Sequence, residues 1–221
     1  MRAARRLVLN FHGLGNPDAG LDDELKYWLE PSYFEDLLDA VGARPDIALT
    51  FDDGNRSDVE IALPALVRRG LKGAFFPVAG RLGEPGYVDD ADLRILAEAG
   101  MEIGSHGMRH RPWRNIDATA AHEELVESRE RLRAAAGRPV LSAACPFGLY
   151  DRRSLTALRQ AGYQTVYTSD GGDTEAGAWL QARNTVTNTS SVADVVAMTN
   201  KQPSKAESLL RIATLAVKRW R

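Results

Sequence analysis

Residues 47–76, IALTFDDGNRSDVEIALPALVRRGLKGAFF, contain a complete strand–helix–strand unit. The unit begins and ends with short apolar runs, as expected of strands that are buried on both faces. Between these runs, Ser57 is followed three residues later by Glu60, a capping-box signature that predicts the start of a helix. The apolar residues that follow have helical spacing, and Gly70 is placed to end the helix.

The same order of strand, loop, helix and glycine recurs at least five times along the chain. Strands are expected at residues 7–11, 47–51, 73–76, 101–103, 140–144 and 163–167, with a seventh at 183–186. Helices are expected at residues 31–41, 57–69, 90–99, 117–136 and 151–161, and from residue 191 onward. This alternation predicts parallel strands joined by right-handed helical crossovers. Periodicity alone allows either an open sheet or a closed barrel.

The 221 residues are enough for one large domain or two small ones. With 44% hydrophobic and 26% charged residues, the composition is that of a soluble globular protein and excludes a disordered or collagen-like chain. A net charge of −2 gives no electrostatic reason to expect a nucleic-acid partner. Because Cys145 is the only cysteine, an internal disulfide and a cysteine-cluster zinc site are excluded.

Residues 1–6 are basic like the start of a signal peptide, but the apolar run at residues 7–9 is interrupted by Asn10 and His12. A secretory signal needs roughly 7–15 apolar residues, so this segment is expected to be a buried strand. No segment approaches the roughly 18–20 apolar residues of a membrane-spanning helix. We therefore expect a cytoplasmic protein.

Two adjacent carboxylates, Asp52 and Asp53, follow the expected strand at residues 47–51 and precede Gly54. Such charges repel each other unless a cation or hydrogen-bond donors compensate. One interpretation is that they only cap the turn into the next helix. The other is that they belong to a charged functional site.

His106 and His110 follow the expected strand at residues 101–103. On a helical turn, an i,i+4 spacing places two imidazoles on one side, which suits the binding of one metal. The alternative is a pair of exposed histidines in a basic loop. Together with Asp53 they would form a three-ligand site with an open position for water, the usual form of a hydrolytic metal centre.

A third loop, residues 143–148 (AACPFG), follows the expected strand at residues 140–144. All three loops leave their strands at the same end of a parallel array, where the active sites of α/β folds are built. Three compatible loops at one end are a stronger signal than any one of them.

These motifs resemble those of the polysaccharide deacetylase family, the NodB-homology metal-dependent hydrolases. Residues 50–54 (TFDDG) match the first family motif, His106 and His110 match the second, and residues 146–151 (PFGLYD) are similar to the third. The similarity extends from about residue 7 to about residue 167, which is most of the chain.

The resemblance implies an α/β fold, a distorted or incomplete (β/α) barrel of about seven parallel strands. It implies that Asp53, His106 and His110 bind a divalent metal, typically Zn²⁺, with Co²⁺, Ni²⁺ or Mn²⁺ as alternatives. Asp52 would be the general base that takes a proton from the attacking water. The backbone N–H of Phe147 would help to stabilise the oxyanion.

The chain departs from the family pattern in two places. The arginine that often precedes the third motif's proline is missing, because residues 143–145 are AAC, and Arg183 is a candidate to replace it. The family's late histidine, the general acid, is also missing, because no histidine follows His122. His122 lies beside Glu123 and Glu124 in the longest expected helix, where we assign it to a solvated face.

His12 directly follows the first expected strand, at the end where the active site is expected. We predict that it supplies a proton to the leaving amine or binds the sugar, and the alternative is a structural histidine. The residues expected to contact substrate are Pro146, Tyr150, Arg183 and Trp179, since aromatic faces suit pyranose rings.

Residues 1–200 are expected to form the catalytic domain, and residues 201–221 a basic helix or tail with six basic residues and one acidic residue. One interpretation of this tail is a helix packed on the barrel. The other is an interfacial helix that makes peripheral contact with anionic lipid.

The expected activity is metal-dependent removal of an N-acetyl group from an amino sugar, in a glycan or a lipid-linked saccharide precursor. Alternatives within the same chemistry are removal of a formyl group or an O-acetyl group. An alternative of another class is a catalytically silent relative that binds glycans. Asp52 favours an enzyme, because binding alone needs no general base.

Overall fold

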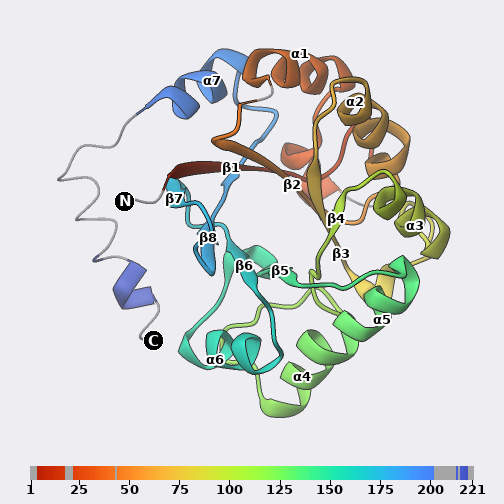
Figure 1. The fold of residues 1–221 in the computed structure, drawn as a ribbon, viewed down its shortest axis with the longest axis vertical. Coiled ribbons are helices and arrows are strands. Elements are labelled where there is room, and N and C mark those ends of the chain that lie inside the picture. Colours follow the sequence, from red (N-terminus) through yellow and green to blue (C-terminus); the bar gives the residue numbers. More distant parts are fainter. Residues whose placement is uncertain (1–3, 18–21, 43, 202–212, 214, 219–221) are drawn as a thin grey trace.

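The computed structural model describes residues 4–17, 22–42, 44–201, 213 and 215–218. Figure 1 shows strands at the centre and helices in a ring around them. The strands are β1 (Arg5–Phe11), β2 (Ile47–Asp53), β3 (Gly73–Pro77), β4 (Glu102–Ile103), β5 (Ser142–Ala144), β6 (Thr165–Thr168), β7 (Asp173–Glu175), β8 (Leu180–Ala182) and β9 (Asn184–Thr185). The α-helices are α1 (Pro31–Val41), α2 (Leu63–Arg68), α3 (Asp90–Glu98), α4 (Ala118–His122), α5 (Ser128–Ala136), α6 (Arg152–Gln160) and α7 (Val192–Asn200). Shorter helical segments are η1 (Asp22–Tyr27), η2 (Asp58–Ala62), η3 (Ala79–Arg81), η4 (Glu123–Glu127) and η5 (Pro146–Gly148).

Two sheets enclose one interior. The first has the order β4-β3-β2-β1-β7 with β9 also paired to β1, and the second has the order β5-β6-β8. A parallel bridge between Ser105 and Ala143 joins the sheets on one side, and on the other the chain passes from β8 to β9 through Arg183. The pairs are parallel except β1 with β7. This distorted (β/α) barrel confirms the predicted fold class; the antiparallel β7 was not expected.

The side chains of β1 alternate between two cores. Leu7, Leu9 and Phe11 pack in the large core between the strands and the helices. Val8 belongs to a small second cluster, which takes residues from both sheets and therefore lies inside the barrel. Because both faces of β1 are buried, its sequence is a nearly continuous apolar run.

The parallel register brings the carboxyl ends of the strands together. Phe11 of β1 lies opposite Phe51 of β2, and Asp53 of β2 lies opposite Pro77 of β3. The loops that follow β1, β2, β4 and β5 therefore leave the barrel at one end, as predicted.

Two predicted helices contain wide turns that the sequence did not reveal. The helix begins next to Ser57, as predicted, but the capping box does not form, because the Ser57 hydroxyl accepts the N–H of Leu14 (3.1 Å) and makes no cap bond. The first segment of this helix is η2, which is π-helical. A second π-helical segment, η4, interrupts the predicted helix at residues 117–136. A π-turn holds one more residue than an α-turn, so it changes which side chains face the interior.

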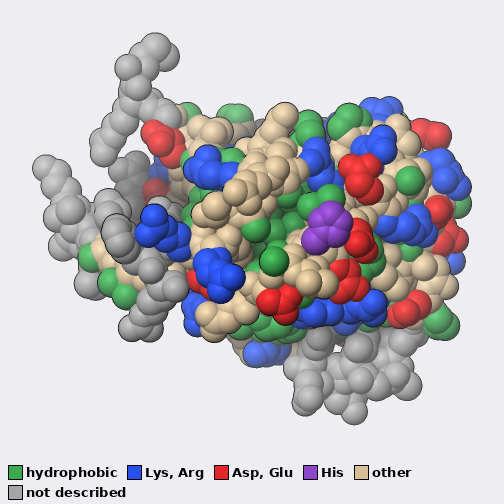
Figure 2. Space-filling model, turned by 90° about the horizontal axis from the view of Figure 1, so that it is seen from below, with side chains coloured by type: hydrophobic (Ala, Val, Ile, Leu, Met, Phe, Trp, Pro, Cys, Tyr) green, Lys and Arg blue, Asp and Glu red, His purple; other side chains and the backbone are tan. Residues whose placement is uncertain are grey.

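Among the described residues, no helix has the length and apolarity needed to span a bilayer. On the face shown in Figure 2, basic and acidic side chains are interspersed. Most of the predicted basic tail, at residues 202–212, 214 and 219–221, lies outside the described residues. Lys218 lies within them, and its ammonium contacts Asp170 Oδ1 (2.5 Å) and the carbonyl oxygen of Gly148 (2.9 Å).

Candidate metal centre

The three predicted metal ligands lie together at the carboxyl end of the barrel. His110 Nε2 is 3.3 Å and His106 Nε2 is 3.7 Å from Asp53 Oδ1. One ligand atom from each of the three residues lies within 4.8 Å of the others, and no other such cluster occurs in the described part of the chain. Two imidazoles and one carboxylate are a suitable donor set for a divalent metal.

His106 is held in the tautomer that a metal ligand needs. Its Nδ1 lies 2.8 Å from the carbonyl oxygen of Ala144. Because that oxygen can only accept a hydrogen bond, Nδ1 carries the proton and Nε2 presents its lone pair to the site. Burial lowers the pKa of His106 to about 3, so the ring is neutral at physiological pH.

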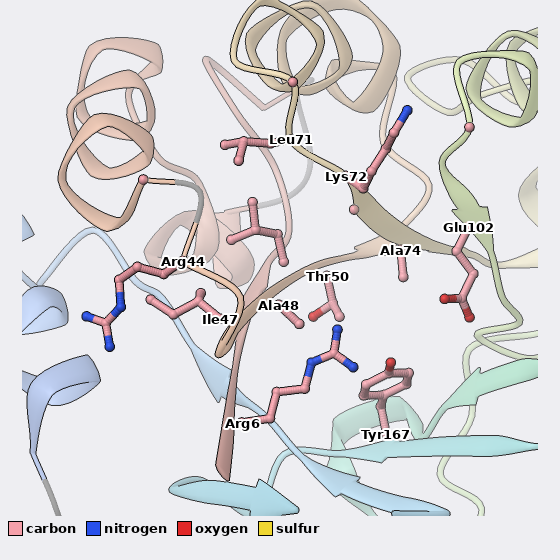
Figure 3. A pocket seen from close by; sticks show the side chains of 15 residues that line it. Arg6, Arg44, Ile47, Ala48, Thr50, Leu71, Lys72, Ala74, Glu102 and Tyr167 are labelled. Atoms are coloured by element: carbon pink, nitrogen blue, oxygen red, sulfur yellow. The ribbon is translucent and has the colours of Figure 1, made fainter. Parts of the chain in front are cut away.

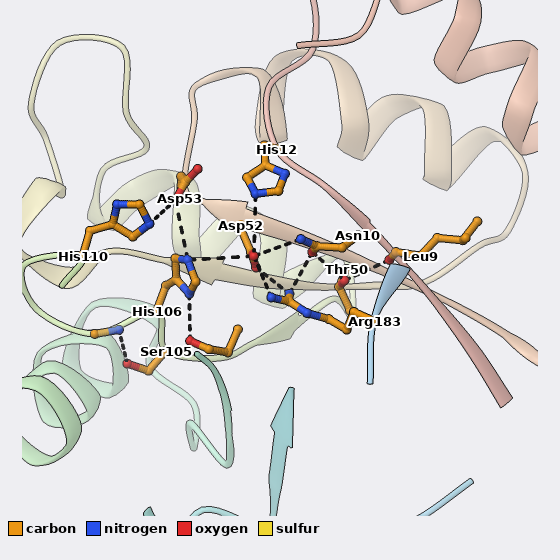
Figure 4. A network of polar contacts seen from close by, with 12 residues as sticks. Leu9, Asn10, His12, Thr50, Asp52, Asp53, Ser105, His106, His110 and Arg183 are labelled. Carbon is orange, nitrogen blue, oxygen red and sulfur yellow. Dashed lines mark hydrogen bonds and ion pairs between the residues drawn. The ribbon is translucent and has the colours of Figure 1, made fainter. Parts of the chain in front are cut away.

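Asp52, the neighbour of Asp53, is bound by a buried guanidinium. Arg183 donates to Asp52 Oδ1 (2.6 Å) and to Oδ2 (2.7 Å), and Asn10 adds a third hydrogen bond to Oδ2 (3.0 Å) (Figure 4). Burial alone would raise the pKa of Asp52, but the charge of Arg183, with a smaller effect of His106, holds it well below the usual value. Asp52 is therefore an ionised carboxylate with a fixed orientation.

Arg183 occupies this position because of the way the barrel closes. Ala182, its predecessor, pairs with Thr168 of β6, and Asn184, its successor, pairs with Leu9 of β1. Arg183 is thus the residue at which the chain changes sheets, and its side chain is only 1% exposed. The structure thus places the guanidinium of Arg183 against Asp52. This is the contact expected of an arginine that replaces the missing motif arginine.

His12 lies on the other side of Asp52. Its Nε2 is 4.0 Å from Asp52 Oδ2, and its ring stacks on Tyr27 with 4.8 Å between centroids. The hydrogen bond from Leu14 N–H to Ser57 ties the loop that carries His12 to the segment that follows β2. The structure therefore places His12 beside Asp52 at the end of the barrel where we expected it.

The backbone is strained at the site. Four non-glycine residues among those described have positive φ: Asp53, His110, Asn115 and Phe147. Three of these four belong to the predicted site, and such conformations persist where the surroundings enforce them. Gly54, next to Asp53, also has positive φ (75°), and a Cβ there would lie 2.7 Å from Pro77. This explains the glycine after the two aspartates.

Phe147 is placed at the mouth of the site. It is 58% exposed, and its ring lies 4.5 Å from the ring of His110. Pro146, which precedes it in η5, is buried. Phe147 thus brings the third motif against the metal-ligand cluster. This contact is possible because the loops that follow β4 and β5 leave the barrel at the same end.

Glu124 supports the loop that carries His110, a role that the sequence did not indicate. It is fully buried, and its carboxylate accepts the backbone N–H groups of Met108 and Arg109, each at 3.0 Å. A Cβ on Gly107 would lie 2.2 Å from Glu124 Oε2, so only glycine fits there. Glu124 lies in the π-turn of η4, where a regular 3.6-residue period does not describe which side chains face the interior. His122, by contrast, is 62% exposed, as predicted.

Replacing Glu124 by Gln is expected to weaken metal binding about 10- to 100-fold, the usual effect of losing a group that orients a ligand loop. The amide keeps the size of the side chain but cannot accept both N–H groups with full charge. The matched control is Glu123→Gln, because Glu123 only pairs with the exposed Arg109 and Arg111. Competition with a metal indicator measures both affinities. Equal affinities in the two variants would show that Glu124 does not position the loop.

The charge balance of the buried site also fits a bound cation. Asp58 is 1% exposed, and neither of its carboxyl oxygens has a hydrogen-bond partner among the described residues. Burial raises its pKa, and the charges of Asp53 and Asp52 raise it further. The raised pKa of Asp58 thus reflects an excess of negative charge at Asp52 and Asp53 beside one guanidinium, and a divalent cation at the triad would offset this excess.

The polar groups of two predicted substrate residues, Tyr150 and Trp179, have partners within the protein. Tyr150 is fully buried, and its hydroxyl donates to Asp170 (2.7 Å). Trp179 precedes β8 and donates to the carbonyl oxygen of Tyr163, which precedes β6. Because β6 and β8 are parallel, Trp179 lies at their amino ends, opposite to the end that carries the metal ligands.

Comparison with known proteins agrees with the fold. Residues 40–166, more than half of the chain, match the polysaccharide deacetylase family model. A putative polysaccharide deacetylase of Bacillus subtilis, YxkH, is 24% identical over 126 residues, which cover 57% of this chain and 45% of that protein. The match thus spans about half the length of this curated relative.

Solved structures show the same architecture. The Streptococcus pyogenes deacetylase PplD, in complex with acetate, superposes with a TM-score of 0.80 at 16% identity, covering 90% of this chain and all of that one. IcaB from Ammonifex degensii gives a TM-score of 0.75 at 20% identity, covering 90% of this chain and 99% of that one. At these identities the likeness shows the fold. The family match, which contains Asp52, the metal-ligand triad and the third motif, shows that the chain belongs to the polysaccharide deacetylase family.

Proposed function

We propose that the protein is a metal-dependent hydrolase that removes an N-acetyl group from an amino sugar, in a glycan or a lipid-linked saccharide precursor. One observation carries this proposal: an ionised Asp52, held by Arg183, lies 3.8 Å from His106 of the triad. A carboxylate base and a set of metal ligands therefore share one buried site. A protein that only binds glycans has no use for the base.

In this mechanism Asp53, His106 and His110 hold the metal. A divalent metal there, most simply Zn²⁺, would supply Lewis-acid activation of water and of the acetamide carbonyl. Asp52 accepts the proton of the attacking water. Its low pKa keeps it ionised at any physiological pH, and the bonds from Arg183 keep its oxygens oriented. Arg183 thus acts as a positioning residue.

Two further groups complete the reaction. The backbone N–H of Phe147 donates a hydrogen bond to the oxyanion that forms at the carbonyl carbon. His12, next to Asp52, gives a proton to the leaving nitrogen, so that the products are a free sugar amine and acetate. His12 supplies the proton that the family's late histidine would supply.

Replacing His12 by Gln is expected to lower the rate of N-acetyl hydrolysis about 100-fold, the lower range for loss of a general acid. Hydrolysis of 4-nitrophenyl acetate should fall much less, because its leaving group departs as an anion without a proton. His122→Gln, at the exposed histidine, is the matched control and should change neither rate. Equal losses for amide and ester would contradict proton donation by His12 and indicate a role in binding.

The substrate class is tested by measuring acetate released from N-acetylated oligosaccharides and from lipid-linked N-acetyl sugars. The protein is loaded with Zn²⁺ or Co²⁺, and free amine is quantified in parallel. Equal amounts of acetate and amine from one substrate class support the proposal. Release of formate, or of acetate only from O-acetyl esters, would reassign the acyl group. A tightly bound metal with no turnover on any substrate would favour a glycan-binding protein.

The compartment and the role of the basic tail stay predictions. Lys218 already pairs with Asp170 on the barrel, which favours a packed tail over a membrane-bound one at that residue. Partitioning of the protein onto anionic vesicles, with and without residues 204–221, distinguishes the two interpretations.

A further inference from the structure

The interior of the barrel opens to a cavity at the end opposite the metal ligands. It has a volume of about 420 Å³ and is lined by the amino-terminal residues of β1, β2, β3 and β4 and by Tyr167 of β6 (Figure 3). None of the residues of the metal-ligand triad lines it. The proposed deacetylation therefore does not account for this cavity.

The cavity exists because small side chains line the barrel interior near the amino-terminal ends of the strands. Ala48 and Ala74, from the adjacent strands β2 and β3, line it. Arg6 is two residues before Val8 on β1, so strand alternation places both side chains on the interior face of the strand. Val8 and Ala74 belong to the small interior cluster that includes Phe76, which lies between this cavity and the catalytic end.

Arg6 has no partner for its charge. Within the described residues its guanidinium makes no hydrogen bond or ion pair, and its Nε is completely buried without a partner. The neighbouring Arg5, which points to the opposite face of β1, pairs with Asp173 (3.1 Å). Figure 3 shows the Arg6 guanidinium and the hydroxyl of Tyr167 directed to the same part of the cavity.

The other basic groups at this cavity are already engaged. Arg44 pairs with Asp46 (2.8 Å), and Lys72 donates to the carbonyl oxygen of Ala99 (2.6 Å). Figure 3 shows both side chains turned away from the Arg6 guanidinium. The carboxylate of Glu102, which also lines the cavity, accepts a hydrogen bond from the hydroxyl of Ser142. Among the described side chains that line the cavity, the donors that remain for a ligand are therefore the guanidinium of Arg6 and the phenolic O–H of Tyr167.

These two donors define the chemistry of a ligand. Leaving the buried Nε of Arg6 unpaired is costly, and the planar N–H groups of a guanidinium match two oxygens of a carboxylate or a phosphate. We propose that this cavity is a binding site for a small oxyanion, the phosphate or carboxylate group of a small molecule, held by Arg6 and Tyr167. The rest of that small molecule would occupy the remaining volume of the cavity.

Calorimetric titration of the full chain with inorganic phosphate and with acetate tests this site. Because both anions can also bind a metal at the triad, each titration is run with the metal-loaded and the metal-free protein. Binding that persists without metal is expected for at least one anion, and the anion that binds identifies the preferred group. Arg6→Met should weaken this binding about tenfold or more, the usual worth of a charged hydrogen bond. Tyr167→Phe should weaken it by a smaller factor.

Arg5→Met is the matched control, since it removes the same charge from the next residue on the opposite face of β1, and it should leave binding unchanged. In the absence of anions, Arg6→Met should unfold at the same temperature as the wild type or higher, because no native partner is lost. The proposal is overturned if neither anion binds without metal, if Arg6→Met and Arg5→Met bind alike, or if Arg6→Met lowers the unfolding temperature. None of these readouts depends on deacetylase activity.

Discussion

Asp52→Asn is expected to lower the deacetylation rate about 10²- to 10⁴-fold, the usual contribution of a general base. The amide cannot accept a proton at neutral pH, but it occupies nearly the same volume. Metal content should not change, because the Asp52 carboxylate is not part of the triad. Acetate release and bound metal, measured on the same sample, check both statements.

Asp53→Asn is the matched comparison at the adjacent position. It should lose both activity and bound metal, because Asp53 provides the only carboxylate oxygen of the triad. Both variants therefore lose activity, but only Asp53→Asn loses its bound metal. An Asp52→Asn protein that retains wild-type activity, or that loses its metal as Asp53→Asn does, would contradict the assignment.

Arg183→Met is expected to destabilise the metal-free protein by about 3–5 kcal/mol, the usual cost of removing one partner from a buried ion pair. Met fills a similar volume without charge, so Asp52 is left buried with only the hydrogen bond from Asn10. The double variant Arg183→Met/Asp52→Asn should recover part of this loss, because the uncompensated charge is gone. Denaturant unfolding of the two single variants and the double variant gives the coupling free energy. Additive effects would show that the pair does not interact.

The Arg183→Met variant should also depend on pH in a defined direction. In the wild type, Arg183 helps to hold the pKa of Asp52 below its unfolded value, so the stabilisation is present above about pH 4 and is lost only as the pH falls further. Without Arg183, the largest contribution that opposes burial is gone, and we expect the pKa of Asp52 to rise above the unfolded value. The stability deficit of the variant should therefore be smallest at strongly acidic pH, where Asp52 is protonated in both proteins, and grow as the pH rises through 4 towards 8. A deficit independent of pH would assign the loss to packing.

The fold could be predicted because its signal repeats. The buried runs of β1, β2 and β3 and the glycines after the helices recur at short intervals, and parallel strands with helical crossovers permit few arrangements. The missed elements are short: β7 and β8 have three residues each and lie in a glycine-rich stretch, where no periodic pattern can develop. Their pairing follows from tertiary contacts with β1 and β6.

The metal-ligand triad could be predicted because its residues lie in two short motifs at the ends of strands. The partnership of Asp52 with Arg183 was harder to foresee, since 131 residues separate them and the contact depends on how the barrel closes. Both Arg183 and His12 lie outside the segment that matches the family model. Their proximity to Asp52 is information that only the three-dimensional structure provides.

Two buried carboxyl groups could not be foreseen at all. Asp58 lies in η2 and Glu124 lies in η4, and both segments are π-helical. A single inserted residue per turn changes which side chains face the interior, while the composition of the segment gives no sign of it. Both groups surround the metal-ligand cluster, where irregular helix geometry is common.

The most direct test of the account is a titration of metal-free protein with Zn²⁺ while acetate release from an N-acetylated saccharide substrate is followed. The account predicts no activity without metal and a rise that ends at one equivalent of metal per chain, because the three ligands form a single site. Activity in the metal-free protein, or one tightly bound metal with no acetate released from any N-acetylated glycan, would contradict it.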